Sequence, residues 1–233
     1  MYFGRLSPIM LSLTNLRIEH AVSTLRRTGA IDVDAFEIKL RKNAKNPRQV
    51  TNHLSECRVA LMFIQNRARV TMRDSPDLMI EWRGELFYAE VKHFKRKKQD
   101  EIDDKSMRQV SGIFAGPVAQ TEKLEGKRPY EQICDVARRK KHQYIDDAIN
   151  ILVIDSASES LELMAKSGAN EYSEELRKTP QDPKLIRLHG IMIINVWARM
   201  AEGFRNVDFA MTESGFAAMS HRLAMSLQTI RAG

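Results

Sequence analysis

The chain has 233 residues and a net charge of +7, and 43% of its residues are hydrophobic. That hydrophobic share can bury a core, which excludes an intrinsically disordered chain. The charge favours a polyanionic partner, nucleic acid ahead of an anionic membrane surface; the alternative is an enzyme with a modest basic excess. Cys57 and Cys134 form no C-x-x-C pair, and no stretch approaches the roughly 18 apolar residues of a membrane span. We therefore expect a reduced, cytoplasmic protein without a membrane association.

Helices are predicted for the first part of the chain, at residues 14–28, 33–43 and about 50–66. The first two form an expected N-terminal helical appendage, about 1–45, to a core of about 50–212. The third helix carries one buried stripe at helical spacing, made by Leu54, Cys57, Leu61 and Ile64.

Residues 75–94, SPDLMIEWRGELFYAEVKHF, predict a β-hairpin, because two alternating runs flank Arg83 and Gly84. If these two residues form the turn, one face of the hairpin is entirely apolar. A three-residue loop with a bulge would shift the pairing by one residue and turn this set outward, so the pattern favours the two-residue turn. The set consists of Leu78, Ile80, Trp82, Phe87, Ala89 and Val91.

After the hairpin, residues 95–128 are highly charged and lack periodicity, so we expect a mobile insertion or a functional loop. Pro129 opens a helix, and continuous apolar runs predict buried strands. The remaining elements are strands at 149–156, 189–197 and 205–212 and helices at 159–178 and about 213–229. This order predicts one α/β domain, spanning 1–233, with a central mixed β-sheet flanked by helices.

The polar face of the hairpin brings Asp77, Glu90 and Lys92 together. With the two-residue turn, Asp77 faces Glu90 at a Cβ separation of about 5 Å, where like charges are destabilising and a shared cation is expected. Carboxylate oxygens suit Mg²⁺ or Mn²⁺, which can activate water and stabilise a phosphoryl transition state. Lys92 could orient or deprotonate that water, or neutralise charge on the phosphate.

Pro76 and Asp77, followed thirteen residues later by Glu90-Val91-Lys92, resemble the PD-(D/E)xK signature of the restriction-endonuclease-like nuclease superfamily. The resemblance implies that Asp77 and Glu90 bind a metal ion, that Lys92 is catalytic and that the backbone carbonyl of Val91 is a further ligand. The order helix, hairpin, helix, strand between about 50 and 156 also resembles the family's core. Residues 1–45 and 160–233 match nothing in it.

The same resemblance implies supporting residues on the two helices beside the hairpin. Glu56 is the candidate for an additional metal-binding acid, and a solvent-facing Glu56 is the alternative. His53, one turn earlier, is expected at the surface. On the helix after the insertion, Lys140 and Gln143 are three residues apart, a spacing that puts them on one helix face, where they could touch the attacking water or the phosphate.

Basic residues near the motif are candidates for contacts with the phosphate backbone. They are Arg138, Arg139, Lys140, Lys141 and Lys95. The alternative is a basic face that is only solvated. Asp155, at the end of a predicted strand, is either a strand-end cap or a neighbour of the site.

The sequence thus predicts a divalent-metal-dependent nuclease, an endonuclease that hydrolyses phosphodiester bonds in DNA sooner than in RNA, with Mg²⁺ or Mn²⁺ as cofactor. The alternatives are a catalytically inactive nucleic-acid-binding or assembly protein of the same fold, and an enzyme acting on another polyanion. Many such nucleases work as dimers, so a homodimer is a further expectation. No G-x-S-x-G, H-E-x-x-H or G-x-G-x-x-G motif occurs.

Overall fold

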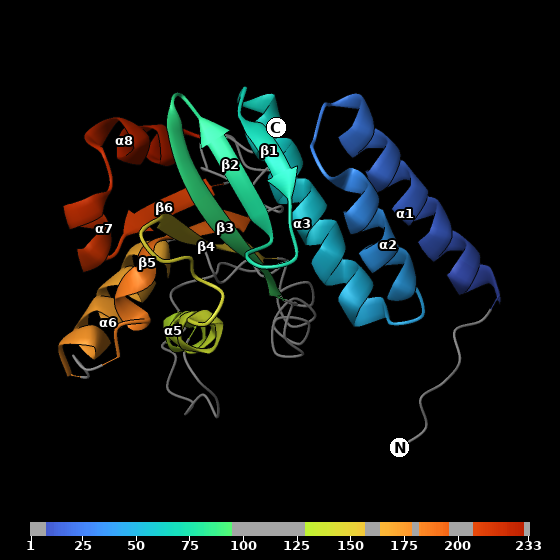
Figure 1. Cartoon of the computed structure of the whole chain (residues 1–233). Helices are drawn as coiled ribbons and strands as arrows, with labels where there is room; N and C mark the ends of the chain where they lie inside the picture. The colour runs from blue at the N-terminus through green and yellow to red at the C-terminus, as the bar shows by residue number, and fades with distance from the viewer. Residues whose placement is uncertain (1–7, 95–128, 157–163, 179–181, 196–206, 231–233) are drawn as a thin grey trace, which may run out of the picture.

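The computed structural model describes residues 8–94, 129–156, 164–178, 182–195 and 207–230 (Figure 1). The predicted insertion at 95–128, with Lys95, lies outside these residues. The helices are α1 (Pro8–Arg27), α2 (Val33–Lys42), α3 (Pro47–Gln65), α5 (Pro129–Lys140), α6 (Met164–Lys178), α7 (Glu213–Ala218) and α8 (His221–Thr229). The strands are β1 (Arg69–Met72), β2 (Leu78–Trp82), β3 (Glu85–Phe94), β4 (Ile149–Ser156), β5 (Leu188–Asn195) and β6 (Val207–Met211).

The six strands form one mixed sheet in the order β1-β2-β3-β4-β5-β6. Strands β1, β2 and β3 form an antiparallel meander, β3, β4 and β5 run parallel, and β6 is antiparallel to β5. The predicted α/β class and mixed sheet are confirmed. Strand β1 was not predicted, since the run of four residues between Arg69 and Met72 is too short for a clear alternation.

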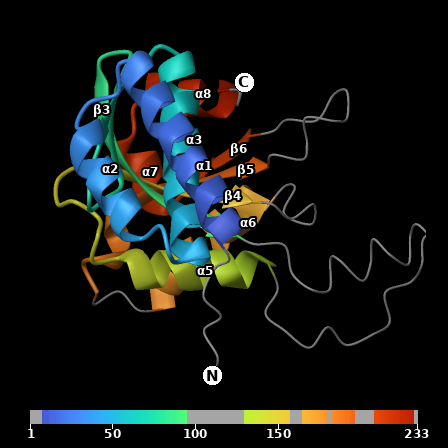
Figure 2. The same cartoon turned by 90° about the vertical axis from the view of Figure 1, so that its right-hand side faces the viewer.

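Helices cover both faces of the sheet and create two cores. Along β4, Val153 points to one core and Leu152 and Ile154 to the other, as expected for a strand buried on both sides. The larger core joins one face of the sheet to α1, α2, α3 and α8, and the smaller core joins the other face to α5 and α6. Figure 2 shows α1, α2 and α3 together on one side of the sheet.

The two N-terminal helices pack into the larger core. Ile18 and Leu25 of α1 and Leu40 of α2 are completely buried there together with Phe63 of α3. Helix α3 begins where the sequence provides an N-terminal cap, because the side chain of Asn46 accepts from two backbone N–H groups and a proline follows at the first helical position. The N-terminal helices are therefore part of the main packing unit, and this fixes α2 beside α3.

The hairpin has the predicted register. Arg83 and Gly84 both adopt a positive φ, of 55° and 86°, so a two-residue turn joins β2 to β3. Trp82 pairs with Glu85 and Leu78 with Ala89. All six residues of the predicted apolar face are buried in the larger core: Leu78, Ile80, Trp82, Phe87, Ala89 and Val91.

Two helices end at other residues than the sequence predicted. The single helix predicted for 213–229 is divided into α7 and α8, because Met219 and Ser220 are extended and the Ser220 hydroxyl accepts from the backbone N–H of Leu223. Helix α5 ends at Lys140, so Gln143 lies in the turn that follows. Of the helices described, none is both long and apolar enough to cross a membrane.

Candidate active site

The candidate site is built where β3 runs on past the end of β2 (Figure 1). The β2–β3 ladder ends at the pair Leu78 and Ala89, so the backbone N–H of Val91 has no partner in β2. The Asp77 carboxylate fills this place, since its Oδ2 accepts from that N–H at 2.9 Å. In a strand the N–H and C=O of one residue point to the same side, so the Val91 carbonyl also faces the edge that holds Asp77.

Asp77 and Glu90 are both buried carboxyl groups, and each affects the pKa of the other. Asp77 is 6% exposed and Glu90 1% exposed. Burial, followed by the charges of Glu90 and Glu56, raises the pKa of Asp77 well above its usual value. Burial also raises the pKa of Glu90, against the opposing effects of Lys140 and of a hydrogen bond from Asp77. The pair predicted from the hairpin register is thus brought together by the fold.

Lys140 of α5 approaches Glu90 from the face of the sheet that the smaller core covers. Its Nζ lies 2.5 Å from Glu90 Oε1, while Glu90 Oε2 is buried without a hydrogen-bond partner among the described residues. A buried carboxylate oxygen without a partner is unfavourable unless a cation or water satisfies it. Glu90 therefore keeps one oxygen available for a ligand.

Lys92 is half-buried on the same face of β3 as Glu90, two residues further along the strand. Burial, together with the positive charges of Lys140 and Arg139, lowers the pKa of Lys92, although Glu90 and Asp77 oppose this shift. An amine with a lowered pKa has a larger neutral fraction near pH 7 and can accept a proton more readily.

Glu56 also belongs to this cluster. It is buried on α3, and the alternative of a solvent-facing Glu56 is wrong. His53 donates through Nδ1 to Glu56 Oε1 at 2.8 Å when Nε2 accepts from Asn43 at 3.2 Å. His53 is itself buried, which corrects the expected surface position. The i, i+3 spacing of His53 and Glu56 on one helix was the signal in the sequence for their contact.

Lys39 of α2 completes the cluster and was not predicted. Its Nζ lies 3.4 Å from Glu56 Oε2, 3.7 Å from Asp77 Oδ1 and 3.9 Å from Asp74 Oδ1. The Coulombic attraction of Glu56 and Asp77 raises the pKa of Lys39, although burial, the largest single effect, opposes it. Two lysines, Lys39 and Lys140, thus face the buried carboxylates from opposite sides of the sheet.

The donor set fits a hard divalent cation. Among the residues that the structure describes, no three His, Cys, Asp or Glu side chains are placed to hold a metal ion as they stand. Mg²⁺ needs fewer, since it is commonly bound by one or two carboxylates with water completing its octahedron. Asp77, Glu90 and the Val91 carbonyl provide such a set, and Glu90 Oε2 is buried without a partner. Glu56 would be a further ligand.

The other basic residues predicted to contact phosphate have partners outside the Asp77 cluster. Arg138 pairs with Asp135 and with Glu175 of α6, and Lys141 pairs with Asp182. Arg139 is exposed, and its guanidinium donates to a backbone carbonyl of its own helix. Of these four, Lys140 alone is paired with an acid of the candidate site among the interactions described.

Gln143 lies beyond the end of α5, so the helical spacing does not place it on one face with Lys140. Its backbone N–H donates to the Lys140 carbonyl at 2.8 Å, and its side-chain Oε1 is buried without a hydrogen-bond partner in the described structure.

Asp155 lies on the opposite face of the sheet from Lys92. Arg58 of α3 donates to it, and His93 Nδ1 is 3.5 Å from the same oxygen. Burial raises the pKa of Asp155, but the His93 hydrogen bond and the Arg58 charge outweigh it and lower the pKa overall. Asp155 is therefore an internal ion-pair partner at the end of β4, not a member of the Asp77 cluster.

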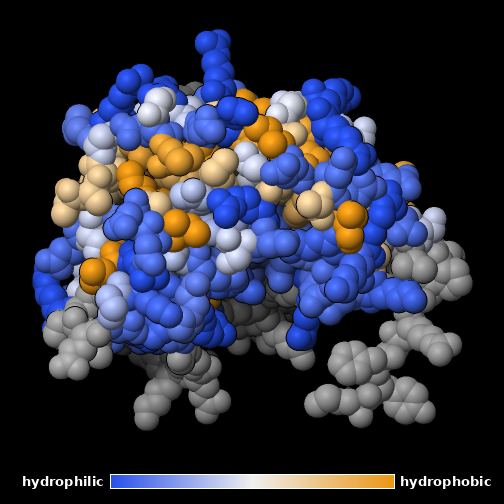
Figure 3. Space-filling model, viewed as in Figure 1, coloured by the Kyte–Doolittle hydropathy of each residue, from blue (hydrophilic) through white to orange (hydrophobic). Residues whose placement is uncertain are grey.

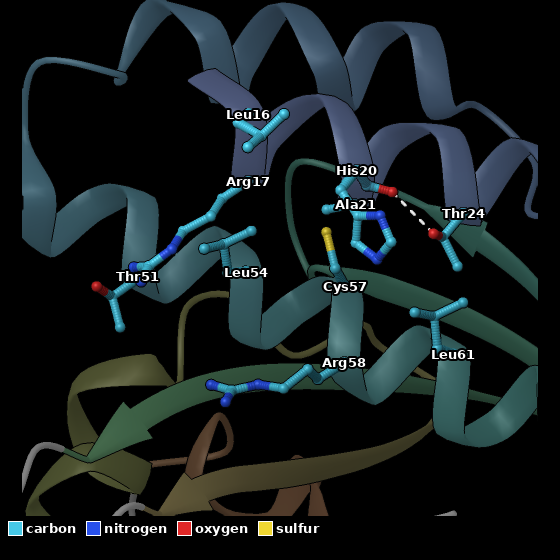
Figure 4. Close-up of a pocket in the computed structure, with 10 residues that line it drawn as sticks. All are labelled: Leu16, Arg17, His20, Ala21, Thr24, Thr51, Leu54, Cys57, Arg58 and Leu61. Atoms are coloured by element: carbon cyan, nitrogen blue, oxygen red, sulfur yellow. Dashed lines mark hydrogen bonds between the residues drawn. The ribbon is translucent and has the colours of Figure 1, made fainter. Parts of the chain in front are cut away.

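A pocket described in the structure lies away from this cluster. It has a volume of about 720 Å³, lies between α1 and α3, and is lined by polar side chains as well as by apolar ones such as Leu16, Leu54 and Leu61 (Figure 4). None of Asp77, Glu90 and Lys92 lines it. Apolar residues also gather over the β2–β3 hairpin, where Leu86 is exposed (Figure 3).

No protein-family model, curated protein or solved structure matches this chain. The geometry of the Asp77 cluster is therefore the basis for a functional proposal.

Proposed function

We propose that this protein is a divalent-metal-dependent nuclease, with DNA as the substrate. The observation that carries the proposal is the buried pair of Asp77 and Glu90 beside the half-buried Lys92. Burying two interacting carboxyl groups destabilises a fold, so such a pair is expected where it serves a ligand. The order α3, hairpin, α5, β4 supports the proposal, since it agrees with the sequence resemblance to PD-(D/E)xK nucleases.

In this proposal Asp77, Glu90 and the Val91 carbonyl hold Mg²⁺ or Mn²⁺, with Glu56 as a further ligand. The bound ion would supply Lewis-acid activation of water and neutralise charge on the phosphate. Asp77 is held in place by its hydrogen bond to the Val91 N–H. That bond joins the residue before β2 to β3 beside the proposed ligands.

Lys92 has the role of a proton acceptor or of a charge partner for the phosphate. Its lowered pKa favours the first role, because the neutral amine can remove a proton from the attacking water. The net charge of +7 and the exposed Arg139 near Lys92 favour the approach of a polyanion.

The proposal is tested by cleavage of plasmid DNA and of labelled single-stranded DNA and RNA, with Mg²⁺, with Mn²⁺ and with chelator. Wild type should cleave DNA only with a divalent ion, and Asp77→Asn should be inactive although folded. Glu81→Gln is the matched control, because Glu81 lies on the same strand but is exposed. Cleavage in chelator, or full activity of Asp77→Asn, would refute the proposal. Absence of cleavage under all conditions, with DNA still bound, would favour the binding-protein alternative.

A further inference from the structure

Helix α2 provides a cation to the acidic cluster. Lys39 Nζ lies within 4 Å of carboxylate oxygens of Glu56 and Asp77, which are both buried, and of the exposed Asp74. The Lys39 side chain is 23% exposed, so solvent screens these contacts less than it screens a surface ion pair. The helix lies outside the segment that carries the sequence resemblance.

The position of Lys39 is fixed by a network between α2 and α3. Asn43 Nδ2 donates to the Lys39 carbonyl at 2.9 Å and lies 3.2 Å from His53 Nε2. His53 in turn holds Glu56. Lys39 and Glu56 are thus presented to each other by two packed helices, and the lysine does not reach the acid as a free surface chain.

The two ammonium groups do not satisfy all the carboxyl oxygens of the cluster, so a divalent cation could bind there. Three buried carboxyl groups, of Asp77, Glu90 and Glu56, face the two ammonium groups of Lys39 and Lys140. Glu90 is 1% exposed, and its Oε2 has no partner within the described structure. A divalent cation that bound Asp77 and Glu56 would need the oxygens that now face Lys39, and it would repel the ammonium group.

We propose that Lys39 is the built-in counter-ion of this site: its ammonium group holds Glu56 and Asp77 together when no divalent cation is bound, and competes with that cation for the same oxygens. The inference rests on the proposed metal site. Lys39 is here a positioning residue, whose loss leaves the carboxylates less stable without metal and more open to metal. Its effect is on loading of the site and is measured without any cleavage.

The experiment compares wild type, Lys39→Met and Lys42→Met in chelator and with Mn²⁺. Lys42 is the matched control, since it lies on the same helix and carries the same charge but is exposed. Melting temperatures are recorded in both conditions, and Mn²⁺ affinity is measured by calorimetry. Lys39→Gln, which keeps a hydrogen-bond donor for Glu56, is measured in parallel in case Lys39→Met does not fold.

For Lys39→Met and Lys39→Gln we expect a lower melting temperature than wild type in chelator, a larger rise on adding Mn²⁺, and Mn²⁺ binding tighter by about tenfold. Lys42→Met should match wild type in all three measurements. Equal or weaker Mn²⁺ binding by both Lys39 variants, with wild type binding normally, would overturn the counter-ion role alone. Absence of Mn²⁺ binding by every protein would overturn the proposed metal site and this inference with it.

Discussion

Asp77→Asn should stabilise the metal-free protein, and the gain should grow as the pH rises. Asn is close in shape to a protonated Asp, and its side-chain oxygen can still accept from the Val91 N–H. Well below pH 4, Asp77 is protonated in both the folded and the unfolded chain, so the pH-dependent part of the difference between wild type and variant vanishes there.

The sign of the pH dependence follows from the raised pKa of Asp77 in the folded protein. A group of this kind binds more protons in the folded than in the unfolded chain between the two pKa values, so it contributes stability at low pH that is lost as the pH rises. The variant has no titrating group at position 77, so its stability does not fall with pH for this reason. Its free energy of unfolding should therefore gain on wild type by up to about 1.4 kcal/mol per pH unit above pH 4.

The gain should level off once the pH passes the pKa of Asp77 in the folded protein. For a chain of this size, about 1.4 kcal/mol corresponds to a shift of roughly 3–6 °C in melting temperature. Urea unfolding in chelator at a series of pH values from 4 to 7 measures the effect. The coupling to Glu90 makes the stated slope an upper bound, because the two carboxyl groups share the proton uptake.

Asp182→Asn provides a control of opposite sign. Lys141 and the Lys184 backbone N–H lower the pKa of Asp182, so this substitution should become less favourable as the pH rises. A difference between Asp77→Asn and wild type that is constant or decreases with pH would refute the reasoning. Asp77 would then be an ionised and well-satisfied carboxylate in the folded protein.

Three further outcomes follow from the hairpin and from α5. Lys92→Ala should bind Mn²⁺ within about twofold of wild type yet cleave DNA at least about 100-fold more slowly, as checked by calorimetry and by single-turnover cleavage. Arg139→Ala should weaken DNA binding and reduce the slope of log affinity against log salt by about one, whereas an unchanged slope would remove Arg139 from the contact surface. Gly84→Ala should lower the free energy of unfolding, measured in urea, by about 1 kcal/mol, because the φ of 86° is strained for alanine. Arg83→Asn should raise the free energy of unfolding, because Asn adopts the positive φ of this turn position more readily than Arg does.

The hairpin and its acids could be predicted because they depend on local rules. Period-two alternation fixes the faces of a strand, and a two-residue turn fixes the register, so the pairing of Trp82 with Glu85 follows from nearby residues alone. The same register places Asp77 opposite Glu90. The burial of Glu56 depended on which face of α3 meets the sheet, and there the sequence left two alternatives.

Lys39 could not be predicted, because its role depends on how α2 packs on α3. Lys39 and Glu56 are 17 residues apart, and nothing in the local pattern of α2 distinguishes Lys39 from the exposed Lys42. The position of Gln143 was predicted from helical spacing that ends at Lys140. Helix ends depend on capping and packing, so the position of a residue such as Gln143, three residues beyond the last helical residue, does not follow from helical spacing.

Calorimetric titration with Mn²⁺, in the absence of nucleic acid and then with an uncleavable DNA analogue, tests most directly whether the Asp77 cluster is a metal site. Wild type and the control Glu81→Gln should bind the ion with the same affinity, and Asp77→Asn and Glu90→Gln should each bind it at least about tenfold more weakly while remaining folded. Equal Mn²⁺ affinity in all four proteins, or no binding by wild type even with the DNA analogue present, would contradict the assignment of Asp77 and Glu90 as metal ligands.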